Sequence, residues 1–333
     1  MFDLLPAYLS DRLGLPCPDL HITAFPGGFS NLTYAISCDA FSYVLRRPPL
    51  GQKISKAHDM VREFKVLEAL EKAGYTKMPK PILVCEDESI IGAPFFLMER
   101  VEGRIIRNKM PADVGPAFFR KLSEQSMDVL IELHQLELEQ SGLLALGKPE
   151  GYVRRQLEGW TERYQKAKTD ELPDLEQAFA WLQENQAPNS SVAFIHNDFK
   201  FDNLVCSSDA EVVAVLDWEM ATIGDPLMDV GTTLAYWAEP GDVDILKMFN
   251  LSYVDGNFSR AELVEYYAAK TSVDMTHILF YYVFGLCKVA VIAQQIYQRY
   301  VQGFSSDARF SVLNQVVKAC GQKAQFSIQH QTI

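Results

Sequence analysis

The sequence lacks the closely spaced cysteines that hold structural zinc or carry out dithiol chemistry. Its six cysteines lie far apart, and no C-x-x-C pair occurs among them (Cys17, Cys38, Cys85, Cys206, Cys287 and Cys320). Nothing in this spacing indicates a zinc site or a redox site. Reduced thiols are typical of the cytoplasm, so we expect a cytoplasmic protein.

An excess of positive charge is also missing. The chain has 43 acidic against 31 basic residues, a formal net charge of -12, and a pI near 5.0. Nucleic acids and anionic membranes are bound by clustered cations. We therefore expect no nucleic-acid partner and no membrane partner, while the oligomeric state stays open.

Uninterrupted apolar runs of membrane-spanning length are absent as well. The most apolar stretch, residues 278–296, is interrupted by Lys288 and contains Gln294 and Gln295, which favours a buried or amphipathic helix. The first residues, M-F-D-L-L-P, carry an acid and a proline where a signal peptide has positive charge and an apolar run, so export is not expected.

The length of 333 residues and the 48% apolar content predict two lobes. Residues 1–101 alternate short β-like runs with turns, at 21–25, 32–37, 41–46, 82–85 and 95–101. The second and third runs are joined by a Cys38-Asp39-Ala40 turn and form an antiparallel hairpin. A helix over 58–73, stopped by Gly74, completes a small antiparallel β lobe with one helix.

Residues 102–333 change to helical spacing of apolar positions. Helices are predicted at 117–139, 152–168 and 175–185, and again from 227 to the end of the chain. Two β-like segments, 193–206 and 212–216, interrupt them. The expected fold is therefore α+β, with a small antiparallel β lobe and a larger, mainly helical lobe.

The most informative segment is F-I-H-N-D-F-K-F-D-N at 194–203, followed by L-D-W-E at 216–219. Phosphoryl transfer from ATP needs an acceptor for the proton of the attacking hydroxyl and oxygen ligands for Mg²⁺ near the γ-phosphate. In the pattern H-x-D-x-x-x-x-N, Asp198 is the candidate catalytic residue. Asn203 and Asp217, fourteen residues apart, are the candidate magnesium ligands.

Two of these residues have a simpler interpretation. Asp198 and Asp217 could be turn residues at strand ends, where Asp is common, although that reading does not explain why Asn203 stands in register with both. His196 is better interpreted as a buried hydrogen-bonding strut behind the loop than as a proton carrier.

These motifs resemble the aminoglycoside phosphotransferase and choline kinase superfamily, a branch of the protein-kinase-like fold. The resemblance is strongest to phosphotransferase-like proteins related to the kinase-like domain of some acyl-CoA dehydrogenases. Supporting stretches are Y-V-L-R-R-P-P from Tyr43, F-F-L-M-E-R-V-E-G-R from Phe95, Q-L-E-G-W from Gln156 and G-D-P-L-M-D from Gly224. The resemblance implies a two-lobe kinase that uses ATP and Mg²⁺.

The resemblance assigns nucleotide-binding roles in the first lobe. The loop Gly27, Gly28, Phe29, Ser30 and Asn31 corresponds to the one that covers the phosphates, although a Gly-Gly turn alone would be an ordinary hairpin. Arg46 stands where many members have lysine to hold the phosphates, with Arg47 as a competitor. Glu63 corresponds to the acid that pairs with this cation, or else is a solvated helix charge.

The hinge and the acids near the site follow from the same resemblance. Glu99 and Val101 would offer main-chain hydrogen bonds to adenine. Glu219 either adds a magnesium contact or forms a salt bridge. Asp225 and Asp229, which begin a helix, would support the catalytic loop, and His134 is interpreted as a packing residue.

The acceptor is less defined by the sequence. The aromatic residues after Asp229 are typical of a core as well as of a ligand site. The acyl-CoA dehydrogenase resemblance favours a hydroxyacyl group on coenzyme A, and an amino sugar or another small alcohol is the alternative. A catalytically silent nucleotide-binding module is a further alternative, whereas a protein kinase is not expected because no A-P-E follows Asp217.

Overall fold

The structure is a computed structural model that describes residues 2–25, 31–49, 59–304 and 307–333. Its first part is a five-stranded antiparallel sheet in the order β1-β2-β3-β5-β4. The strands are β1 (His21–Ala24), β2 (Leu32–Cys38), β3 (Phe41–Arg47), β4 (Pro81–Cys85) and β5 (Phe95–Glu99). The predicted antiparallel sheet is confirmed, with strand ends one to two residues from those expected.

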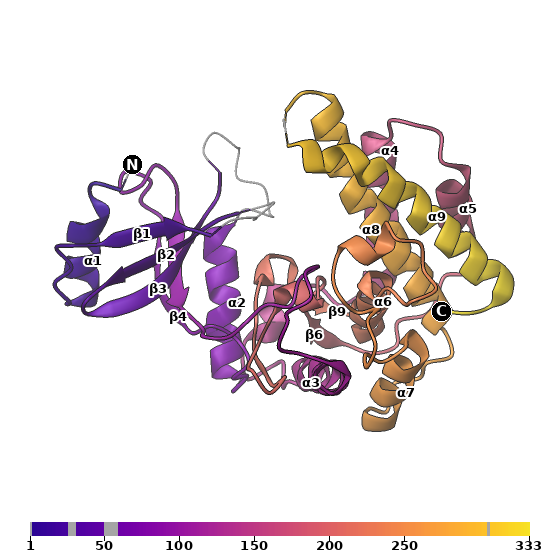
Figure 1. The fold of residues 1–333 in the computed structure, drawn as a ribbon, viewed down its shortest axis with the longest axis horizontal. Coiled ribbons are helices and arrows are strands. Elements are labelled where there is room, and N and C mark those ends of the chain that lie inside the picture. The colour runs from indigo at the N-terminus through magenta and orange to yellow at the C-terminus, as the bar shows by residue number, and fades with distance from the viewer. Residues whose placement is uncertain (1, 26–30, 50–58, 305–306) are drawn as a thin grey trace.

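Two helices cover the two faces of this sheet. Helix α1 (Leu5–Leu13) packs on the outer face, and α2 (Met60–Lys72) lies between the sheet and the helical lobe (Figure 1). Helix α2 begins at Asp59, whose side chain accepts a hydrogen bond from the backbone N–H of Arg62, a common helix cap. The sequence predicted one helix here and missed α1.

Side chains of β3 alternate between these two faces. Val44 belongs to the main core beneath α2, and Leu45 belongs to the separate core beneath α1. Because successive side chains of a strand point to opposite faces, Arg46 falls on the α2 side and Arg47 on the α1 side. The strand therefore presents only one of its two arginines to the helical lobe.

The second lobe is mainly helical, as predicted. Its long helices surround two small antiparallel sheets, β6 with β9 and β7 with β8. The helices are α3 (Pro116–His134), α4 (Tyr152–Ala167), α5 (Pro173–Glu184), α6 (Pro226–Tyr236), α7 (Arg260–Lys270), α8 (Ile278–Val301) and α9 (Leu313–His330). Helices resume after residue 225 as predicted, and between α6 and α7 the only helical element described is the short 3-10 turn Leu246–Met248.

Helix α8 crosses the centre of this lobe in close contact with α6. A Cβ atom on Gly231 of α6 would overlap the carbonyl of Tyr281, and one on Gly285 of α8 would overlap the carbonyl of Gly231. Two glycines thus let the backbones approach each other. By length and composition α8 could span a membrane, but 78% of its most apolar window is buried within the described structure, as in a core helix.

Candidate active site

The two small sheets bring the two predicted loops together. Strand β6 (Ala193–Ile195) leads into the loop 196–203, which ends at β7 (Leu204–Cys206), and β8 (Val212–Val215) leads into the loop that contains Asp217. Strands β7 and β8 pair, and the backbone N–H of Leu216 donates to the carbonyl of Asn203 at 2.8 Å. This pairing places Asn203 and Asp217 on adjacent backbones.

The carboxylate of Asp198 is held by several donors. Lys200 Nζ donates to both oxygens, at 3.0 Å and 2.7 Å, and Asn203 Nδ2 donates to Oδ2 at 3.0 Å. The ring of Tyr236 lies 4.5 Å from Lys200 Nζ. A carboxylate held by Lys200 and Asn203 has a fixed direction, which suits it to orienting a hydroxyl.

His196 is fully buried and satisfied on both ring nitrogens. Its Nε2 donates to the carbonyl of Leu216 at 2.9 Å, and its Nδ1 accepts from the backbone N–H of Asp198 at 3.2 Å. Burial lowers its pKa, which outweighs the attraction of the nearby carboxylates of Asp229 and Asp198. A neutral imidazole with both nitrogens occupied acts as a strut between the two loops.

Asp229, on α6, anchors the start of the loop 196–203, the predicted catalytic loop. Its carboxylate accepts from the backbone N–H groups of His196 at 2.6 Å and Asn197 at 2.8 Å, and His134 Nε2 lies 3.2 Å away. Burial would raise the pKa of Asp229, but the bond to His134 and the other donors lower it. Asp229 therefore remains ionised and structural.

Arg46 forms ion pairs with carboxylates of both lobes. Its Nη1 lies 3.1 Å from Glu63 Oε1 on α2, and its Nη2 lies 2.8 Å from Asp217 Oδ1 and 3.4 Å from Glu219 Oε2. Three carboxylates therefore share one guanidinium. The structure pairs Arg46 with Glu63, the arrangement that the resemblance implies.

The protonation of these acids follows from burial. Burial raises the pKa of Glu63 to about 7 against the pull of Arg46, and the charge of Asp217 adds to the rise. Burial would also raise the pKa of Asp217, but the adjacent guanidinium of Arg46 lowers it. At neutral pH, Asp217 is therefore ionised and Glu63 is partly protonated.

Arg47, the competitor for the phosphate role, lies on the other side of the sheet. It is fully buried, and it donates from Nε to the carbonyl of Pro48 at 3.1 Å and from Nη1 to the carbonyl of Ile91 at 3.0 Å. Only Arg46 of the two contacts the Asp217 loop.

Of the predicted phosphate loop, Gly27, Gly28, Phe29 and Ser30 lie outside the described residues. Asn31, at its end, donates from Nδ2 to Glu219 Oε2 at 2.7 Å. Glu219 also lies beside Arg46, so of its two proposed roles the structure shows the ion pair. Asn31 thus contacts the loop after Asp217.

The predicted hinge residues lie where the chain leaves the sheet. Glu99 ends β5 and its side chain is exposed, and Val101 follows it, half-buried. By Arg104 the chain has reached the second lobe, where it forms a β-bridge with Cys206. The boundary between residues 1–101 and 102–333 and the adenine-binding role of this segment stay predictions.

The donor set at Asn203 and Asp217 fits Mg²⁺. No described residue donates to Asn203 Oδ1 or to Asp217 Oδ2, because Asn203 turns its Nδ2 toward Asp198 and Arg46 binds the other oxygen of Asp217. Mg²⁺ prefers such oxygen ligands and takes few from the protein, with phosphates and water completing the shell. Among the described residues, this site included, no group of three or more His, Cys, Asp or Glu side chains is arranged to hold a metal by itself.

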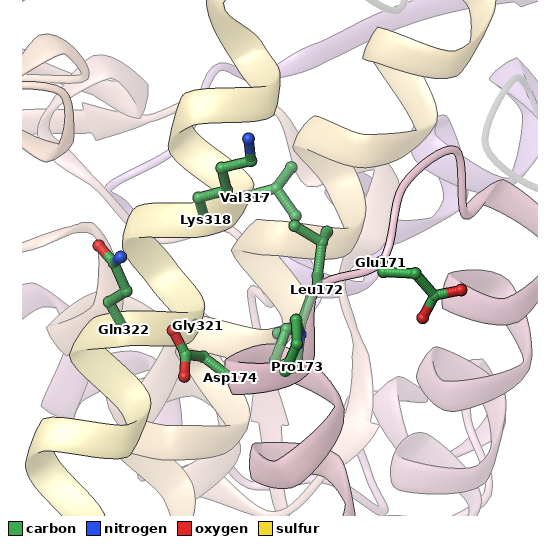
Figure 2. Close-up of a pocket in the computed structure, with 9 residues that line it drawn as sticks. Glu171, Leu172, Pro173, Asp174, Val317, Lys318, Gly321 and Gln322 are labelled. Carbon is green, nitrogen blue, oxygen red and sulfur yellow. The ribbon is translucent and has the colours of Figure 1, made fainter.

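Figure 2 shows a pocket at a different place, between α5 and α9. Its volume is about 180 Å³, and its lining includes Glu171, Asp174 and Lys318 but none of the predicted site residues. Gly321 of α9 borders the pocket, and a Cβ there would crowd Leu175 at 2.9 Å from its backbone nitrogen.

Sequence reasoning missed two residues of the site. Lys200 holds Asp198, and its place two residues after Asp198 in the motif is the signal that could have identified it. Arg62 of α2 donates to the carbonyls of Glu219 at 3.2 Å and Ala221 at 2.5 Å. It stabilises the loop after Asp217, and only the packing of α2 reveals it.

A two-lobe fold with an Asp–Lys–Asn loop beside a second Asp defines a kinase-like phosphotransferase. Residues 21–264 match the model of the Phosphotransferase enzyme family, and the chain belongs to this family. The similarity extends through both lobes and includes the catalytic loop.

Solved structures share the fold. An aminoglycoside phosphotransferase-like protein from Ralstonia eutropha is 27% identical with a TM-score of 0.82, and 98% of each chain is covered. Choline kinase from Cryptosporidium parvum has a TM-score of 0.67 at 12% identity, covering 99% of this chain and 96% of that one. The complex of aminoglycoside phosphotransferase APH(4)-Ia with AMP-PNP and hygromycin B has a TM-score of 0.60 at 15% identity, covering 96% and 98%.

Relatives with similar sequences are longer proteins. Acyl-CoA dehydrogenase family member 11 from Homo sapiens is 35% identical over 291 residues, which cover 86% of this chain and 37% of that protein. Acyl-CoA dehydrogenase family member 10 from Mus musculus is 34% identical over 312 residues, covering 92% and 29%. The chain thus spans less than half the length of these relatives.

Proposed function

We propose that this protein is a small-molecule kinase that transfers the γ-phosphate of ATP to a hydroxyl group, with Mg²⁺ as cofactor. The observation that supports this most directly is the pairing of β7 with β8. It places Asp198, Asn203 and Asp217 on adjacent loops, beside an arginine of the sheet. We propose that the reaction takes place in the cytoplasm and that its partner is a hydroxylated metabolite.

Each residue has a role in the transfer. The acceptor hydroxyl attacks the γ-phosphorus as the bond to ADP breaks, and Asp198 accepts a hydrogen bond from that hydroxyl and finally its proton. Because charge on the phosphoryl oxygens dominates this transition state, orientation by Asp198 matters more than strong basicity. Lys200, 2.7 Å from Asp198, provides positive charge near the transferred group.

The remaining residues bind the nucleotide. Arg46 exchanges part of its contact with Asp217 for the phosphates, and Glu63 keeps its guanidinium in place. Asn203 and Asp217 would hold Mg²⁺, which when bound neutralises the phosphate oxygens. Glu99 and Val101 would contact adenine through the main chain.

A hydroxyacyl group carried on coenzyme A is the acceptor we propose. The support is that similar sequences form part of proteins named as acyl-CoA dehydrogenase family members. A kinase and a dehydrogenase in one chain would be expected to act on related substrates. The TM-score of 0.82 with the aminoglycoside phosphotransferase-like structure favours an amino sugar as the second candidate.

An ATP-consumption screen tests both acceptors. Hydroxyacyl-CoAs, amino sugars, choline-like alcohols and sugar metabolites are each incubated with ATP and Mg²⁺, with the Asp198→Asn variant as the control. We expect phosphorylated hydroxyacyl-CoA from the wild type only. Equal ATP consumption by the wild type and Asp198→Asn, or no consumption with any acceptor, would contradict the kinase proposal. The alternative would then be a catalytically silent nucleotide-binding module.

A further inference from the structure

A buried lysine on α8 contacts the catalytic loop from behind. Lys288 is 2% exposed, and its Nζ donates to the carbonyl oxygen of Asn197 at 2.5 Å. Thr232 Oγ1 on α6 lies 3.4 Å from the same Nζ, and the ring of Trp160 on α4 lies 5.8 Å away. The mechanism above makes no use of this cation.

The contact is possible because of the close crossing of α6 and α8. Gly231 is adjacent to Thr232, and Gly285 precedes Lys288 by about one helical turn, so the glycine contact lies beside the lysine. A larger residue at either glycine would move α8, and with it Lys288, away from the loop. A charged residue in so apolar a helix is costly unless it is paired.

Asn197, the partner of Lys288, has an unusual backbone. Its φ is 67°, in the left-handed region that residues other than glycine seldom adopt. Its N–H is bound by Asp229 at 2.8 Å, and its side-chain nitrogen donates to Tyr152 Oη at 3.0 Å and to the carbonyl of Met220 at 3.1 Å. Lys288 binds the remaining backbone group, the carbonyl.

That carbonyl belongs to the peptide group that leads into Asp198. The N–H of the same peptide group donates to His196 Nδ1 at 3.2 Å. The Asn197–Asp198 peptide plane is thus held through its N–H by His196 and through its carbonyl by Lys288. A rotation of this plane would change the direction in which Asp198 leaves the backbone.

We propose that Lys288 is a positioning residue, which fixes the Asn197–Asp198 peptide from the core and thereby aims the carboxylate of Asp198 at the acceptor hydroxyl. This inference rests on the proposed kinase function. It assigns a role in the reaction to a helix that contributes no residue to the predicted site.

The electrostatics around Lys288 agree with this role. Burial lowers its pKa to about 8, while the negative charges of Asp198 and Asp229 oppose that fall and the positive charges of Lys200 and Arg163 add to it. The charged form therefore predominates below about pH 8. Loss of the proton above that pH weakens the hold on the Asn197 carbonyl, because a charged donor forms the stronger hydrogen bond.

Lys288→Met tests the inference, because methionine has similar length and no donor. Gln294→Met is the matched control: Gln294 is also buried on α8, but it donates to the carbonyl of Ala167 and to Thr169 Oγ1, each at 2.9 Å, away from the catalytic loop. Wild type and both variants are compared by melting temperature, ATP binding, kcat and KM, and by hydrogen–deuterium exchange of residues 196–203.

In Lys288→Met we expect kcat to fall about 10- to 100-fold with KM for ATP unchanged, and exchange at residues 196–203 to accelerate. Gln294→Met should lose comparable thermal stability and keep its kcat. A kcat in folded Lys288→Met within twofold of wild type, or an equal loss of kcat in Gln294→Met, overturns the proposal.

Two further measurements separate the possible failures. The pH profile of the wild type serves as the test if Lys288→Met does not fold. The wild-type kcat should decline as the pH rises through about 8, and a flat profile from pH 7 to 9.5 overturns the proposal. If the wild type has no kinase activity, the proposed function fails. The exchange data then decide alone, and unchanged exchange in Lys288→Met refutes the positioning role.

Discussion

Arg46 Nη2 in the sheet lies 2.8 Å from Asp217 Oδ1 in the loop after β8. The contact joins a residue expected to bind phosphate to a residue expected to bind magnesium, from two different lobes. A nucleotide with its metal would enter between the charges that form this contact. The lobes are therefore joined in part by groups that we expect the nucleotide and its metal to engage.

Substitution of each of the two adjacent arginines, Arg46 and Arg47, tests this arrangement. Arg46→Met should weaken ATP binding by about 10-fold or more, because a charge-assisted hydrogen bond to phosphate is lost. Arg47→Met should leave ATP affinity within about twofold and act on the melting temperature instead, because Arg47 binds the carbonyls of Pro48 and Ile91. Calorimetric titration with ATP measures the difference, and equal affinities in the two variants would contradict the face assignment.

Asp198→Asn should lower turnover by at least about 100-fold and leave ATP binding nearly intact. The amide keeps the shape of the carboxylate but cannot accept the proton, and it loses the charge that Lys200 contacts at 2.7 Å. Steady-state kinetics and ATP titration separate the two effects. Asp209→Asn, an exposed acid in the β7–β8 turn, is the control, and near-normal turnover in Asp198→Asn would remove Asp198 from the mechanism.

Asp217→Ala should abolish the magnesium dependence of ATP binding. The variant removes the oxygen to which no described residue donates, and it also releases Arg46 from one of its three carboxylates. Calorimetry of ATP with and without Mg²⁺ gives the test, with Asp209→Ala for comparison. If Mg²⁺ strengthens ATP binding equally in both variants, Asp217 is not a ligand.

Glu63→Gln should alter how stability depends on pH. The pKa of Glu63 is raised in the folded protein to about 7 from 4.5, so the folded state holds this proton where the unfolded state has lost it. The contribution of Glu63 to stability is therefore fully present below about pH 4.5 and is lost as the pH rises through about 7. Glutamine does not titrate.

Thermal melts between pH 5 and 8 measure this effect. The melting temperature of Glu63→Gln relative to wild type should increase with pH over this range. A constant difference would mean that Glu63 stays ionised throughout, as an acid fully neutralised by Arg46 would.

Linear spacing was enough to predict Asp198, Asn203 and Asp217, because the two loops are joined by one short hairpin. The choice between Arg46 and Arg47 could not be made from the sequence, because both faces of β3 are apolar. Alternation predicts only that the two arginines point to opposite faces. The structure decides between them, since it places Val44 in the core beneath α2 and Leu45 in the core beneath α1.

Other features could not be derived from local pattern. Helix α1 has nine residues, and only Leu5 and Leu9 of it are buried, which is too short a stripe for periodicity to detect. Lys288 lies 91 residues from Asn197 along the chain, and only the packing of α8 on α6 brings them together. In the sequence this lysine served merely as an interruption of an apolar run.

The pairing of β2 with β3 places Cys38 opposite Phe41 and Thr33 opposite Arg46. A shift of one residue in this strand register would turn the guanidinium of Arg46 into the apolar core under α1. An adjacent residue of β3 would then face the proposed nucleotide site. The turn between these strands consists of Asp39 and Ala40. Its length therefore sets the register that directs Arg46 toward the proposed nucleotide site. Insertions there should be tolerated only when they bulge outward and leave the ladder in register.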